Sequence, residues 1–205
     1  MGKQKKIRIL SEQEAQKLIE NIPFPEYQLL AKLTLNHGLR NSEAISLKRK
    51  DFNLDNQSFW VIEGKRGKDR ELPIHSDIKG ELEEHLNEME THEYLFPSPV
   101  TDSHISSRFF QLIIRRASVK AGLYDDNEDY DVNKPEDVTY EVPYHDRVTP
   151  HTLRHTFSIR LLRNNTPIQE VSKLLGHDSV EITIESYDFL DIETGRTHMN
   201  EVSFA

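Results

Sequence analysis

TPHTLRHTF occupies residues 149–157 and begins a helix with polar side chains. Thr149 is a suitable N-cap, and Pro150 is favoured at the first helical position because its missing N–H would lack an intrahelical partner there anyway. His151 and Arg154 are three residues apart and therefore share one face of this helix. The pair could belong to a functional site or simply to a polar outer face of the helix. We therefore interpret it together with the other segments of the chain.

The apolar positions of the same helix are Leu153, Phe157 and Leu161, and we expect them to line its inner face, opposite the polar pair. His155 is interpreted as a histidine that packs against a neighbouring helix.

Two further segments follow: LLGHDSV at 174–180 and ESYDF at 185–189. Gly176 is a typical helix stop. A histidine directly after it, His177, is favoured by the negative end of the helix dipole whatever its function. Tyr187 is one of seven tyrosines, and only its place ten residues after His177 distinguishes it.

Upstream, basic residues lie beside glycines in two further segments, HGLRNSE at 37–43 and EGKRGKDRELPI at 63–74. Gly38 ends a leucine-rich helix, and Arg40 just beyond it could simply satisfy carbonyls at that helix end. The β-branched and aromatic residues at 58–62, followed by a glycine-containing turn, predict a β-hairpin. A lysine in such a turn is ordinarily a solvated surface residue.

The whole pattern predicts an α+β protein, mainly α-helical with a small antiparallel β-sheet. The helix at 11–21 begins with a capping box, Ser11 with Glu14. The other predicted helices cover residues 29–38, 41–47, 76–91, 103–122, 149 onward, 167–176 and 179–187.

Composition limits the class of protein. A chain of 205 residues can bury one sizeable core, its apolar fraction is 36%, and it has no cysteine for disulfides or thiolate–metal sites. No apolar run approaches the roughly 18 residues that span a bilayer, and the basic amino terminus lacks a signal-peptide core. These features predict a cytoplasmic protein without membrane contact.

The net charge of −9 is unevenly distributed. The segment 124–147 contains nine acidic and two basic residues, a net charge of −7, which leaves −2 for the remainder. Because local patches determine phosphate contacts, DNA binding remains compatible with this composition. The acidic segment itself should avoid a phosphate backbone.

Taken together and in this order, the motifs resemble the active-site motifs of tyrosine recombinases, the phage-integrase and Xer-type family. The resemblance covers residues 11–188. It implies that 1–205 forms the DNA breaking–rejoining catalytic domain, which cuts double-stranded DNA through a covalent 3′-phosphotyrosine without metal, ATP or another cofactor. It also implies a tetramer on paired DNA sites.

In that resemblance each motif supplies one chemical role. Arginine suits a phosphate clamp because its planar fork binds phosphate bidentately, and tyrosine is both a usable nucleophile and a fair leaving group. The implied roles are phosphate clamps at Arg40 and Arg154, a buttress at Glu43, a proton donor at Lys65, an assistant to proton transfer at His151, a phosphate hydrogen bond at His177 and the nucleophile at Tyr187. The implied DNA-contacting bases are Lys48, Arg66, Lys68 and Arg70.

The chain departs from the family pattern at several places. Arg66 stands where glycine is more common, which leaves Lys68 as an alternative to Lys65. The acidic insert at about 124–147 is longer than usual. No segment fits the amino-terminal core-binding domain, so the chain is either a catalytic fragment or a naturally short recombinase. The tail at 188–205 packs on a neighbouring protomer in the family, or frays.

Three rival functions remain open. A type IB topoisomerase shares the chemistry but relaxes supercoils without pairing sites. A histidine-based metal hydrolase would use His145, His151, His155 and His177, although the glutamate of a zinc protease is absent between His151 and His155. A non-catalytic DNA-binding relative is the third.

Overall fold

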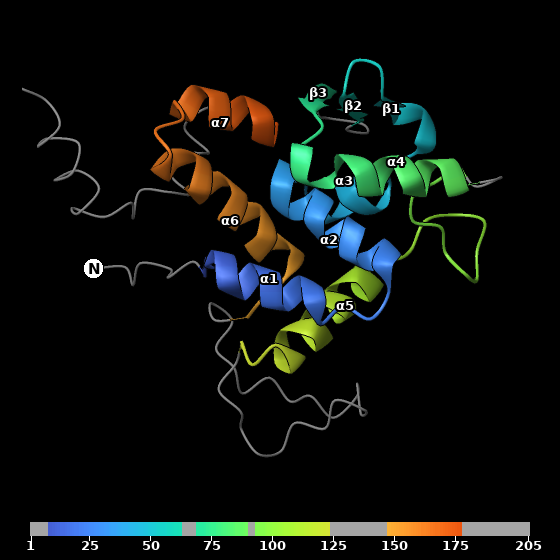
Figure 1. Cartoon of the computed structure of the whole chain (residues 1–205), viewed down its shortest axis with the longest axis horizontal. Coiled ribbons are helices and arrows are strands. Elements are labelled where there is room, and N and C mark those ends of the chain that lie inside the picture. Colours follow the sequence, from blue (N-terminus) through green and yellow to red (C-terminus); the bar gives the residue numbers. More distant parts are fainter. Residues whose placement is uncertain (1–7, 63–68, 90–92, 124–146, 178–205) are drawn as a thin grey trace, which may run out of the picture.

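The computed structural model describes residues 8–62, 69–89, 93–123 and 147–177, and these form a mainly helical molecule with one small antiparallel sheet (Figure 1). The predicted fold class is therefore confirmed. The elements in chain order are α1 (Glu12–Glu20), α2 (Pro25–His37), α3 (Asn41–Ile45), η1 (Arg49–Asp51), β1 (Phe52–Asn53), β2 (Ser58–Val61), β3 (Arg70–Pro73), η2 (Ser76–Ile78), α4 (Lys79–Glu88), α5 (Ser107–Lys120), α6 (Pro150–Arg163) and α7 (Ile168–Leu175).

Helix α1 starts as its sequence predicts. The Glu14 N–H donates to the Ser11 hydroxyl at 3.1 Å, and the Ser11 N–H donates to the Glu14 carboxylate at 2.8 Å. These two bonds satisfy donors that have no partner within the helix, which is the function of a capping box.

Helix α2 is the centre of the fold, because α1, α3, α4 and α6 all pack against it. It ends at Gly38, whose φ of +63° is the left-handed conformation that glycine adopts without strain. A Cβ at this position would lie 2.4 Å from the Phe157 ring of α6. Only glycine therefore lets the end of α2 approach α6 so closely, and Arg40 follows two residues later.

The predicted hairpin is present and lies in a three-stranded sheet of order β1-β2-β3. Phe59 of β2 pairs with Leu72 of β3, and Val61 pairs with Arg70. All four of these residues are buried, so Arg70 lies on the inner face of the sheet. The two-residue strand β1 was not predicted, because so short a strand has no readable alternation.

Helix α6 begins at Pro150, with Thr149 as N-cap, as predicted. The predicted division of its faces is wrong in one respect. Leu153 is buried, but Phe157 and Leu161 are only partly buried, whereas Arg154 is 4% exposed. The reason is that α2, α5 and α7 all contact α6, so its polar side is also enclosed.

Helix α7 ends at Gly176, as predicted, and the predicted helix at 76–91 is divided into η2 and α4. The helix predicted at 179–187, the tail at 188–205 and all of the acidic insert except Arg147 lie outside the described residues. No helix in the described part of the chain is long and apolar enough to cross a membrane.

Candidate active site

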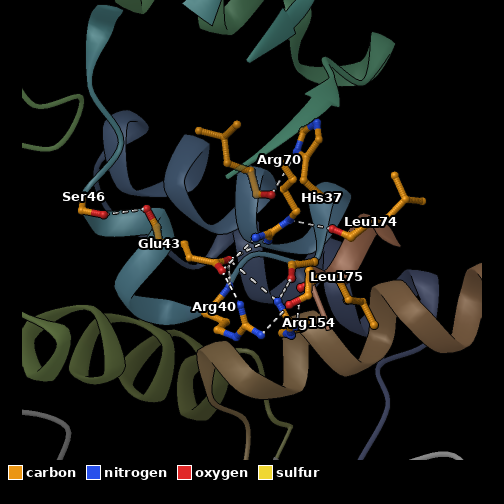
Figure 2. Close-up of polar contacts among 11 residues, drawn as sticks. His37, Arg40, Glu43, Ser46, Arg70, Arg154, Leu174 and Leu175 are labelled. Carbon is orange, nitrogen blue, oxygen red and sulfur yellow. Dashed lines mark hydrogen bonds and ion pairs between the residues drawn. The ribbon is translucent and has the colours of Figure 1, made fainter. Parts of the chain in front are cut away.

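Arg154 is the buried centre of a polar cluster where α6 meets the ends of α2 and α7 (Figure 2). Its Nη1 donates to the Gly38 carbonyl at 2.6 Å, and its Nη2 donates to the Leu175 carbonyl at 2.8 Å. One guanidinium thus joins the carboxyl ends of two helices. The positive charge is favourable there, because helix carboxyl ends carry partial negative charge.

Arg40 lies beside it at the edge of the cluster, with its side chain 35% exposed. Its Nη2 donates to the Gly176 carbonyl at 3.0 Å, and its Nη1 donates to Glu43 Oε1 at 2.7 Å. The structure therefore brings the two predicted clamp arginines together. Arg40 is the more accessible of the two to a ligand from solution.

Glu43 is buried and joins three arginines (Figure 2). It accepts from Arg40 as described and from both Nη atoms of Arg70, at 3.0 and 2.8 Å, and its Oε2 lies 3.8 Å from Arg154 Nη1. Burial alone would raise the pKa of Glu43. The hydrogen bonds and charges of Arg70, with the Arg40 N–H and the charge of Arg154, outweigh burial and hold this pKa below its ordinary value.

These groups leave the cluster positively charged. Three guanidinium groups surround one carboxylate, which is a local excess of two positive charges. The ionised, buried carboxylate orients the three arginines and cancels only one of their three charges. Such an arrangement can receive an anion at its exposed edge, beside Arg40.

Arg70 corrects a sequence prediction. We expected it among the bases that contact DNA, but its side chain is 9% exposed and its guanidinium binds Glu43 and the Leu174 carbonyl, the latter through Nε at 2.9 Å. A group so enclosed supports the site from within. Arg70 and the buried Leu72 are two residues apart on β3 and therefore share one face of the sheet, and this spacing was the signal that could have identified the buried position of Arg70.

The carboxyl end of α7 explains why three arginines meet here. The N–H of Gly176 donates to the Lys173 carbonyl and the N–H of His177 donates to the Ser172 carbonyl, both at 3.1 Å, which is a Schellman motif. Each of the next three carbonyls accepts from a different arginine: Leu174 from Arg70, Leu175 from Arg154 and Gly176 from Arg40.

His177 follows this turn and is half-buried. Burial, together with the positive charges of Arg154, Arg40 and Arg70, lowers its pKa to about 4. It is therefore neutral at neutral pH, and a neutral imidazole can offer one N–H donor to an anion.

His151 and His155 lie one turn apart on α6, and their rings contact edge to face with centroids 4.2 Å apart. Burial and the charge of Arg154 lower the pKa of His151. Burial, with the nearby His151 and Arg154, lowers the pKa of His155 to about 4. Of the two, His151 is the exposed one, and it lies on the outer side of the helix start.

Other predicted residues are placed elsewhere or not described. Lys48 Nζ lies 2.7 Å from a Glu93 carboxylate oxygen and 4.7 Å from the centre of the Tyr94 ring. Lys65, Arg66, Lys68 and Tyr187 lie outside the described residues.

Within the described ranges, no group of three or more histidine, aspartate or glutamate side chains could hold a metal ion. His145, a member of the alternative histidine set, lies outside them.

Known proteins are similar to this chain in sequence and in fold. Tyrosine recombinase XerA of Pyrococcus furiosus is 31% identical over 179 residues, which cover 85% of this chain and 54% of XerA. The probable integrase/recombinase YoeC of Bacillus subtilis is 29% identical over 162 residues, which cover 79% of this chain and 76% of YoeC. The chain spans about half the length of the XerA relatives that it matches.

Among solved structures, the crystal structure of XerA recombinase matches with a TM-score of 0.74 and 28% identity, over 95% of this chain and 64% of that one. The XerH site-specific recombinase, crystallised on its palindromic difH substrate after cleavage, matches with a TM-score of 0.70 and 24% identity, over 95% of this chain and 53% of that one. The fold is therefore that of the tyrosine-recombinase catalytic domain. The sequence profile of the Phage integrase family matches residues 8–192, nearly the whole chain, and this chain therefore belongs to the phage integrase family.

Proposed function

We propose that this chain is a site-specific DNA recombinase that breaks and rejoins double-stranded DNA through a covalent 3′-phosphotyrosine. One observation carries the proposal: Arg40, Arg154 and His177 come from separate segments and converge around one buried carboxylate, Glu43. That arrangement suits a phosphodiester, whose two non-bridging oxygens gain negative charge in the transition state.

The chemistry that we infer is a phosphoryl transfer. The Tyr187 oxygen attacks phosphorus, a bond forms between them, and the bond from phosphorus to the 5′ oxygen breaks. The phenolic proton passes from Tyr187 to the neutral imidazole of His151, and the departing 5′ oxygen takes a proton from Lys65, so charge and atoms balance. The reverse reaction rejoins the strands, because a phenol is a fair leaving group.

The supporting residues act by position and charge. Arg40 and Arg154 hold the non-bridging oxygens, His177 donates a hydrogen bond to the phosphate, and His151 assists proton transfer at the exposed start of α6. Neutral histidines suit this assignment, because they can donate hydrogen bonds and transfer protons while the arginines supply the positive charge. Glu43 holds the arginines in place.

DNA is the partner that we infer for the exposed edge of the cluster. Relatives of this fold have been crystallised on DNA, XerH among them. We assign backbone contacts to Lys48, Arg66 and Lys68, and we expect assembly into a tetramer on paired sites. Residues 1–205 are proposed as one catalytic domain, with the acidic insert at about 124–147 kept away from DNA.

A nicked suicide substrate tests the function. After cleavage the short leaving strand diffuses away, so the covalent adduct accumulates and resists denaturant. We expect an adduct from the unaltered protein and none from Tyr187→Phe, with DNA binding retained. Tyr27→Phe is the matched control, because Tyr27 contacts Phe24 and Phe109 away from the cluster and should form adduct normally. Adduct from Tyr187→Phe at the normal level would refute the assignment.

A further inference from the structure

We propose that Arg70 is a positioning residue of this active site. It holds Glu43 and the carboxyl-terminal turn of α7 in a fixed relative position, so that both clamp arginines and His177 can contact the same phosphate. The inference rests on the proposed function. It gives a role to a residue that the sequence suggested only as a DNA contact.

The first argument is the number of connections that one side chain makes. Arg70 begins β3, and its Nη1 and Nη2 bind the two oxygens of Glu43, which lies in α3. Its Nε binds the Leu174 carbonyl in the last turn of α7. The guanidinium therefore joins the sheet, α3 and α7 in one rigid plane, as Figure 2 shows.

The second argument is close packing. Gly176 has a φ of +64°, and a Cβ built on it would lie 2.7 Å from Arg70 Nη1. The backbone turn that carries His177 thus lies directly on the Arg70 guanidinium. A displacement of Arg70 would move this turn, and with it the Gly176 carbonyl that Arg40 binds.

The third argument concerns what the site loses without Arg70. Glu43 would keep its bonds from the Arg40 N–H and Nη1 and its ionic contact with Arg154, but it would lose the bidentate pair from Arg70. Glu43 would then no longer be tied to β3 and, through the same guanidinium, to the last turn of α7. Small displacements matter greatly in phosphoryl transfer, where positioning supplies most of the catalysis.

The titration of His177 distinguishes this role from simple support of the fold. Among the described residues, the groups whose charges act on His177 include Arg154 and His155 of α6, Arg40, Glu43 of α3 and Arg70 of β3. Burial lowers the pKa of His177 to about 4 together with the positive charges of Arg154, Arg40 and Arg70. Loss of its charge should therefore raise that pKa, whereas loss of its geometry alone should not.

Two variants separate charge from geometry. Arg70→Lys keeps the charge but cannot form the planar pair with Glu43 and the Nε bond together. Arg70→Gln removes the charge as well. Arg8→Gln is the matched control, because Arg8 also binds a glutamate, Glu14, at 3.0 Å but lies in the segment that precedes α1. Each full-length variant is first checked for folding by thermal unfolding.

The measurements are the single-turnover cleavage rate at saturating suicide DNA, the Kd for DNA with its salt dependence, and the pKa of His177 by NMR titration. We expect Arg70→Lys to lower the rate on the order of 10- to 100-fold with Kd and His177 pKa nearly unchanged. Arg70→Gln should lower the rate similarly and raise the His177 pKa. Arg8→Gln should leave all three unchanged.

Other outcomes would overturn the inference. Full cleavage by folded Arg70→Lys would show that the bidentate geometry is unnecessary. Weakened DNA binding with a shallower salt dependence, at an unchanged rate, would restore Arg70 as a phosphate contact. Should Arg70→Gln not fold, Arg70→Lys alone decides. Absence of adduct from the unaltered protein would refute the proposed function instead, while the His177 titration would still test the contact.

Discussion

Two helix ends show the difference between an arginine that stabilises a helix and arginines that form a site. At the end of α4, one arginine among the described residues, Arg49, donates to the carbonyls of Leu86 and Met89. At the end of α7, three arginines bind three successive carbonyls and share the buried Glu43. One arginine suffices to satisfy a helix end. The excess positive charge at α7 calls for another explanation, and an anionic ligand supplies it.

The sequence left two interpretations of Arg40. Arg40 could have been an arginine that satisfies carbonyls or one that binds phosphate. In the structure it does bind the Gly176 carbonyl, through Nη2, while a third of its side chain remains exposed. The carbonyl contact therefore does not exclude the phosphate contact that we propose for Arg40.

The largest effect that we predict comes from a steric clash at the end of α2, beside the polar cluster. Gly38→Ala forces a left-handed alanine, at about 1–2 kcal/mol, and drives its Cβ into Phe157, at a further 1–3 kcal/mol or so. Gly122→Ala is the control, because Gly122 has φ +64° with no atom within 4 Å of a built Cβ. Chemical denaturation should therefore show a clearly larger loss for Gly38→Ala. Equal losses would mean that the contact between α2 and α6 is not tight.

Next in size is the loss of a clamp. Arg40→Ala should reduce the cleavage rate on the order of 10²–10³-fold, as removal of one transition-state donor does, without unfolding the protein. Arg49→Ala, at the α4 end, should cleave normally. If both variants cleaved equally well, the two helix ends would not differ in function.

A third prediction concerns pH and His37, in the last turn of α2. This buried histidine binds the Leu33 carbonyl through Nδ1 and accepts the His75 N–H at Nε2, and burial lowers its pKa to about 4. Between pH 6.5 and 4 the unfolded chain gains a proton that folded His37 does not. Stability should therefore fall as the pH falls through this window, by roughly 3 kcal/mol from His37.

His37→Gln should flatten that pH dependence of the unfolding free energy. Some slope should remain, because the pKa values of His155 and His177 are lowered in the same direction. An unchanged slope in the variant would show that His37 takes up its proton normally when folded.

The smallest predicted effect is that of a chelator. Because the positive charge of the proposed site comes from arginines and Lys65, excess EDTA should leave the cleavage rate unchanged within error. Loss of activity in EDTA with recovery on adding a divalent ion would favour the histidine-metal alternative.

Local signals predicted most of the fold. The capping box at Ser11, the glycine stops at Gly38 and Gly176 and the proline start at Pro150 each depend on backbone chemistry within a few residues, so the sequence reveals them. The burial of Arg154 was not predictable in this way. It depends on α2, α5 and α7 surrounding α6, which is a tertiary effect.

The candidate site likewise contains residues that the sequence predicted and one whose position depends on tertiary packing. Motif spacing led to Arg40, Glu43, Arg154 and His177, and the structure brings these four together. Arg70 was assigned to the wrong surface, because a basic residue beside a turn resembles a DNA contact and its partner Glu43 lies far away in sequence. The sequence could suggest the inner face of the strand, but only the packed structure identifies the carboxylate that makes the arginine stable there.

The most direct test of the central claim is to identify the residue that carries the DNA. The protein is reacted with a suicide substrate in EDTA, digested with protease and nuclease, and analysed by mass spectrometry. We expect a nucleotide remnant attached through its 3′ phosphate to the peptide that contains Tyr187, with a free 5′ hydroxyl on the released strand. A remnant on any other residue, or strand cleavage without a covalent adduct, would contradict it.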